Sequence, residues 1–69
     1  MKWIKCMREL PPLYLFVLIT YKDRGDLYVT VADLVPKDDG YKWVSPLLGN
    51  SIVSNVSAWA HIPDPCNDN

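Results

Sequence analysis

Three potential metal ligands lie within six residues near the end of the chain: His61, Asp64 and Cys66. Imidazole, carboxylate and thiolate groups all bind zinc, but a zinc site normally has a fourth protein ligand or a catalytic water molecule. Pro63 and Pro65 stiffen the segment, which works against convergence of the three side chains on one ion. We therefore expect no metal and interpret His61 as an exposed residue at the end of a strand.

A nucleophilic enzyme would need Cys6 or Cys66 beside His61, with an acid to orient the imidazole. Only Cys66 is near His61 in the sequence, and no catalytic motif surrounds it. The three glycines are isolated, so the chain has no glycine-rich loop that would hold a phosphate group. We expect a protein that is not an enzyme and that uses no cofactor.

The two cysteines, Cys6 and Cys66, lie near opposite ends of the 69-residue chain. A disulfide between them would close a long loop and remove much of the entropy of the unfolded chain. In a cytosolic protein, two scattered cysteines are more often reduced. The disulfide therefore remains an open alternative.

Aromatic side chains on a sheet can stack on nucleic-acid bases, as in small barrels that bind single strands. The candidates are Tyr14, Tyr28, Tyr41 and Trp43. A face of this kind is normally basic, whereas the chain has seven Lys and Arg against eight Asp and Glu, a formal net charge of −1. Nucleic-acid binding is therefore the second hypothesis, and core or rim positions are more typical for these rings.

The element that must position these side chains is the uncharged segment at residues 13–21. It lacks Gly and Pro and is rich in β-branched and aromatic residues, which is typical of a strand. Pro11 and Pro12 precede it directly and a charged turn follows, so its length fits a strand better than a helix. We predict a central strand with both faces covered. The segment is too short to span a bilayer, and we expect no membrane partner.

A hairpin is predicted next, with a loop of three to five residues within residues 22–26 in which Gly25 takes a positive φ. The partner strand is predicted at residues 27–35, where aliphatic residues alternate with others. With Tyr21 opposite Leu27, the aliphatic residues share one buried face. The residues assigned to that face are Leu27, Val29 and Val31.

The rest of the chain predicts shorter elements: a turn at residues 36–40, a strand at 41–44, a loop at 46–55 and a last strand at 56–62. The fold class is all-β, a small antiparallel meander forming a curved sheet or an SH3-like barrel of three to five strands. At most one short helical turn is expected, before Pro11. We predict a single small domain over residues 1–69, with a frayed tail at 66–69.

Several short patterns along the chain occur together in one known family. They are Trp3-Ile4 near the start, Leu10-Pro11 before the apolar segment, Trp43 after the turn at Gly40, and the closing segment 56–65 with Trp59 and Pro63. In these residues the chain resembles the small phage and prophage family catalogued as domain of unknown function 551. Its members begin with Trp-Ile and end in Val-x-x-Trp-x-x-Leu-Pro-x-Pro.

Three departures from the family pattern concern the end of the chain: the usual His before the last Trp is Ala58, His61 follows that Trp, and residues 45–55 form a longer segment. The resemblance implies a bacteriophage or prophage origin and a location in the cytoplasm of an infected bacterium. It implies no activity.

Our functional hypothesis is a non-catalytic protein that binds a host protein, in host takeover or in inhibition of a defence system such as CRISPR or restriction. A meander has exposed edges, and the predicted edge strand is residues 41–44 or residues 56–62. Aromatic residues rimmed by charge are typical of interface hot spots. The predicted partner-binding residues are Tyr28, Tyr41, Trp43, Asp38 and Asp39. We expect a monomer or a weak homodimer paired through an edge strand.

Overall fold

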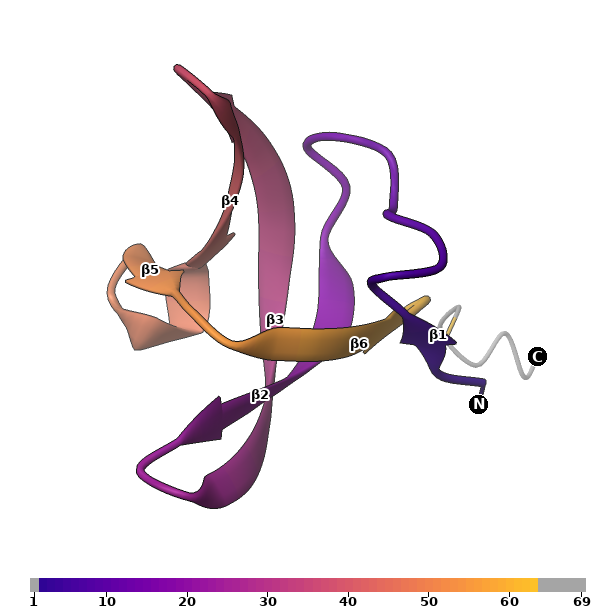
Figure 1. Cartoon of the computed structure of the whole chain (residues 1–69), viewed down its shortest axis with the longest axis vertical. Coiled ribbons are helices and arrows are strands. Elements are labelled where there is room, and N and C mark those ends of the chain that lie inside the picture. Colours follow the sequence, from indigo (N-terminus) through magenta and orange to yellow (C-terminus); the bar gives the residue numbers. More distant parts are fainter. Residues whose placement is uncertain (1, 64–69) are drawn as a thin grey trace, which may run out of the picture.

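The structure, a computed structural model, describes residues 2–63 and contains one open antiparallel sheet of six strands (Figure 1). The strand order across the sheet is β1-β6-β2-β3-β4-β5. The elements are β1 (Ile4–Lys5), β2 (Val17–Asp23), β3 (Asp26–Lys37), β4 (Gly40–Ser45), the 3-10 turn η1 (Pro46–Leu48), β5 (Ser51–Val53) and β6 (Val56–Ala60). The all-β class is confirmed, but the sheet has more strands than predicted and is not an SH3-like barrel. The predicted tail at 66–69 lies outside the described residues.

The turn between β2 and β3 consists of two residues, Arg24 and Gly25, between the paired residues Asp23 and Asp26. Arg24 has a φ of 53° and Gly25 a φ of 86°. Positive φ at both central residues is the requirement of a type I′ turn, whose twist matches that of the flanking strands. The hairpin was therefore predicted correctly, but with a loop that is too long.

The shorter turn changes the register of the hairpin by one residue. Tyr21 pairs with Tyr28, whereas the sequence predicts Tyr21 opposite Leu27. Because successive side chains of a strand point to opposite faces, a shift by one residue exchanges the two faces of β3. The residues of β3 on the buried face are Thr30, Ala32 and Leu34, and Leu27 and Val29 are exposed on the other face.

β3 is the longest strand, with 12 residues, and it connects the two halves of the sheet. Its residues 26–32 pair with β2, and residues 33–37 pair with β4. Pro36 belongs to β3 and pairs with Tyr41, so the second turn is shorter than predicted and consists of Asp38 and Asp39. The strand predicted at 41–44 is confirmed as β4.

The core lies on one face of the sheet, which curls over it without closing. Cross-strand neighbours share this face: Ile19 pairs with Trp59, and Trp43 lies between Leu34 and Val53. The buried cluster comprises Val17, Ile19, Ala32, Leu34, Trp43, Val53 and Trp59. β1 and β5 are the two ends of the sheet, and no pairing joins them within residues 2–63.

The predicted central strand is correct only in its second half. β2 begins at Val17, and residues 13–16 form an exposed turn and loop in which Tyr14 has a φ of 63°. A β conformation is therefore interrupted at Tyr14, although its residue type favours a strand. The last strand, β6, ends at Ala60, two residues earlier than predicted. The predicted loop at 46–55 contains η1 and β5.

Candidate protein-binding surface

The structure separates the predicted partner-binding residues into two groups at opposite ends of the molecule. Tyr28 lies near the β2–β3 turn, whereas Tyr41 follows the β3–β4 turn that contains Asp38 and Asp39. Figure 1 shows these two hairpin tips at opposite ends of the long axis, which measures 45 Å. From Tyr28 to Pro36, the partner of Tyr41, β3 extends by roughly 26 Å at about 3.3 Å per residue. One compact patch cannot contain both tyrosines.

The two tips offer different surfaces to a partner. Tyr41 is 53% exposed, whereas Trp43 is only 9% exposed and belongs to the core. Tyr28 is 45% exposed, and its ring stacks on Tyr21 with centroids 5.6 Å apart. Trp43 thus gives a partner little surface, and one face of the Tyr28 ring is occupied within the molecule.

The predicted edge strands are wrong. β4 lies between β3 and β5, and β6 lies between β1 and β2. The sequence-based prediction assumes a simple meander, in which the last strand is at an edge. Here β6 instead returns to pair with β2, on the side of β2 that β3 does not occupy.

A further edge occurs inside the sheet, along the first half of β3. The residues that flank a two-residue turn form a hydrogen-bonded pair, so the backbone groups of Asp26 and of every second residue after it face β2. The backbone N–H and C=O groups of Leu27, Val29 and Val31 point away from β2. Ser45 Oγ donates a hydrogen bond to the Val31 carbonyl oxygen at 2.7 Å, in agreement with that direction. Within residues 2–63, no strand pairs with β3 at Leu27 or Val29 on this side.

The side chains beside this edge are apolar and exposed. Leu27 is 68% exposed and Val29 is 59% exposed. Val31, half-buried, continues the same row, and we call these three residues the outer strip. An exposed face of an antiparallel sheet normally carries polar residues, so this row is unusual. The alternation of residues 27–35 predicts that the outer strip lies in the core. A two-residue Arg-Gly turn, in place of a longer loop, is the sequence signal that places it outside.

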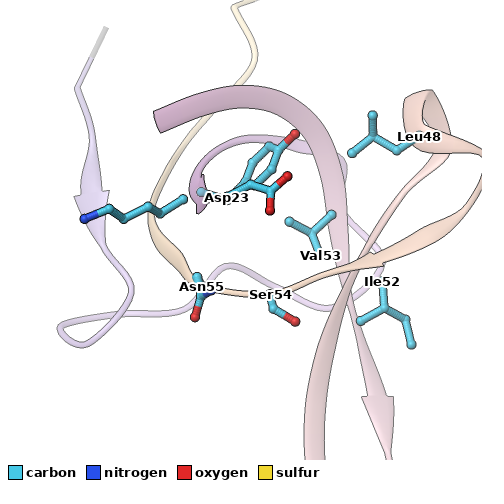
Figure 2. Close-up of a pocket in the computed structure, with 8 residues that line it drawn as sticks. Asp23, Leu48, Ile52, Val53, Ser54 and Asn55 are labelled. Atoms are coloured by element: carbon cyan, nitrogen blue, oxygen red, sulfur yellow. The ribbon is translucent and has the colours of Figure 1, made fainter. Parts of the chain in front are cut away.

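A pocket of about 430 Å³ lies between the end of β2 and β5 (Figure 2). Its lining residues are Tyr21, Lys22, Asp23, Leu48, Ile52, Val53, Ser54 and Asn55. The Lys22 N–H donates to the Asn55 carbonyl oxygen at 3.2 Å, which joins the two walls. Figure 2 shows Leu48, Ile52 and Val53 on one side and Asp23 opposite. The lining contains neither histidine nor cysteine. The pocket therefore suits the binding of an apolar group, with polar residues at its rim, better than nucleophilic catalysis.

The residues considered for metal binding or catalysis do not form a site in the described part of the chain. His61 is exposed, and its ring and the Trp59 ring are in a T-shaped arrangement with centroids 5.0 Å apart. Asp64 and Cys66 lie outside the described residues, and with them the possible disulfide of Cys6. Burial raises the pKa of the Cys6 thiol, which lowers its thiolate fraction and its reactivity. Within residues 2–63, no group of three potential metal ligands occurs.

Comparison with known proteins does not assign the chain to a family. No family model matches it, and no curated protein or solved structure matches it either. The resemblance to the phage family therefore stays a prediction that depends on the residues quoted above.

Proposed function

We propose that this chain is a non-catalytic binding protein that engages a host protein in an infected bacterium, in takeover of the host or inhibition of a defence system. The phage origin and the cytoplasmic location come from the family resemblance. The observation that carries the proposal is the outer strip, where Leu27 and Val29 are both more than half exposed beside a stretch of strand edge that no strand within residues 2–63 pairs with.

A protein is the partner best suited to such a surface. The backbone N–H and C=O groups of Leu27 and Val29 can pair with an extended segment of another chain, which would add a strand to the sheet. The outer strip would supply apolar contacts beside that strand, and the charged residues Asp26 and Arg24 would lie at its rim. Tyr28, on the opposite face of the same strand, is then the predicted aromatic residue closest to the partner.

Nucleic acid remains the alternative, with less support. One face of the Tyr28 ring is stacked on Tyr21, so this ring presents only its other face to a base. The nearby cations Lys22 and Arg24 alternate with Asp23 and Asp26, which would repel phosphates.

Site-specific photo-crosslinking in host cells tests the proposal. A photoreactive residue is placed at Val29 in one variant and, in a matched variant, at Tyr41, which is similarly exposed but lies at the opposite tip. We expect a discrete crosslinked host protein from position 29, and none from position 41. Crosslinks from position 41 alone would move the site to the β3–β4 turn. Crosslinks to nucleic acid, with affinity falling steeply as salt rises, would favour the alternative.

A further inference from the structure

The loop before β2 exposes four consecutive large apolar side chains. The exposed fractions are 40% for Leu13, 67% for Tyr14, 39% for Leu15 and 50% for Phe16. Leu10, a few residues earlier, is also 42% exposed. Runs of this length are normally kept off a protein surface unless they have a function, because they promote unspecific association.

The backbone of this segment is fixed at several points. Pro11 is buried, and the Tyr14 N–H donates to the Leu34 carbonyl oxygen at 3.0 Å. Upstream, the Trp59 indole N–H donates to the Glu9 carbonyl oxygen at 2.8 Å. Tyr14 has a φ of 63°, a value that bulky residues rarely adopt and that tends to persist only where the surroundings impose it. The fold therefore holds this loop in place with its apolar side chains outside.

The chain just before the loop is basic. Lys2, Lys5 and Arg8 are exposed and line one hollow of about 360 Å³ together with Trp3, Ile4 and Glu9. Residues 2–16 thus carry three basic side chains against one acidic side chain, although the whole chain has a formal net charge of −1. Figure 1 shows that residues 6–16 run along the side of the molecule where β1 lies, away from β5.

We propose that residues 2–16 form a docking surface for an anionic lipid bilayer. Exposed leucine and aromatic residues, here Tyr14, Phe16 and Trp3, suit the boundary between headgroups and acyl chains. The basic residues suit anionic headgroups. A protein partner would contact alternate side chains of the loop or enclose single side chains in pockets. Four consecutive apolar side chains suit the fluid acyl chains of a bilayer better.

This inference differs from the expectation of no membrane partner, which rested on the segment at residues 13–21 being too short to span a bilayer. It concerns contact with a bilayer surface. In the part of the chain that the structure describes, no helix is long and apolar enough to cross a membrane. The surface is separate from the outer strip, so the membrane inference and the proposed function can fail independently.

Co-sedimentation of the purified full chain with vesicles tests the inference. One set of vesicles is pure phosphatidylcholine, and the other is equimolar phosphatidylcholine and phosphatidylglycerol. We expect binding to the anionic vesicles, weaker binding to the neutral ones, and a decrease in binding as salt rises. Absence of binding to the anionic vesicles would overturn the inference and leave a protein as the occupant of the loop.

Two double variants separate the loop from unspecific hydrophobic adsorption. Tyr14→Asn with Phe16→Ser removes both rings, and Asn tolerates the positive φ at position 14, so folding should be kept. We expect its partition onto anionic vesicles to fall by about tenfold or more. Leu27→Ser with Val29→Ser removes similarly exposed apolar groups from the outer strip and should leave partition unchanged. An equal loss in both variants, or no loss in the first, would overturn the inference; circular dichroism confirms that each variant is folded.

Discussion

Trp59 joins the loop before β2 to the sheet, and its replacement by Phe should destabilise the fold strongly. The side chain is 1% exposed, and its indole N–H donates to the Glu9 carbonyl oxygen at 2.8 Å. Its neighbours across the strands are Ile19 of β2 and Ile4 of β1. Trp59→Phe keeps an aromatic ring in the core but removes the hydrogen bond and the five-membered ring.

The expected loss can be worked out from these two contributions. The net value of the hydrogen bond is about 1 kcal/mol. A phenyl ring buries roughly 40 Å² less apolar surface than an indole, which at about 25 cal/mol per Å² amounts to about 1 kcal/mol more. The sum of about 2 kcal/mol is a large part of the total free energy of unfolding, which is roughly 3–10 kcal/mol for a chain of 69 residues. It corresponds to a decrease in Tm of about 8–16 °C.

Urea and thermal unfolding followed by circular dichroism measure this loss. Trp3→Phe is the matched control because Trp3 is 39% exposed, and its free energy of unfolding should change by less than about 0.5 kcal/mol. Equal effects of the two substitutions would refute the reasoning, since burial and the hydrogen bond of Trp59 would then not determine the loss of stability.

Three further predictions concern other parts of the fold. Ser45→Ala removes a hydroxyl that donates to the Val31 carbonyl oxygen of β3 and lies 3.2 Å from Thr30 Oγ1. The substitution should lower the free energy of unfolding by about 1–3 kcal/mol. In a double-mutant cycle, adding Thr30→Val should recover part of this loss. Tyr14→Asn relieves a left-handed backbone at φ 63° and should raise the free energy of unfolding by about 0.5–1 kcal/mol; a decrease would show that the ring is packed. Burial raises the pKa of the Cys6 thiol, so above about pH 8.5 the thiol ionises in the unfolded chain before it ionises in the folded protein. The folded protein should therefore lose stability as the pH rises through this range. Unfolding measured at several pH values in a Cys66→Ser background tests this loss.

Much of the strand pattern could be predicted from the sequence because local residue types determine it. Gly25 and Gly40 mark the two hairpins, and both hairpins form with positive φ at these glycines. The strand at 27–35 lies inside β3, and the strand at 41–44 lies inside β4. These predictions depend only on contacts between residues close in the sequence.

The sequence did not predict the pairing of distant strands. Pro63 predicts that the last strand ends near residue 62, and β6 ends at Ala60. Nothing local indicates that β6 pairs between β1 and β2. This pairing depends on Trp59, which packs against Ile19 and hydrogen-bonds to Glu9. A contact between residues 50 positions apart leaves no periodic pattern that could be recognised in the sequence.

Both candidate binding surfaces lie where hydrophobic residues misled the prediction. The segment 13–16 and the outer strip have the composition of buried strands, and that composition predicts core positions for both. The two-residue turn Arg24-Gly25 sets the register that exposes the outer strip. The left-handed backbone at Tyr14 interrupts the strand and exposes residues 13–16. Folding stability alone would favour polar residues at such exposed positions. Natural sequences tend to depart from local rules at functional sites. Our two proposals place a partner over each of these surfaces, so variants of either surface should affect binding more than stability.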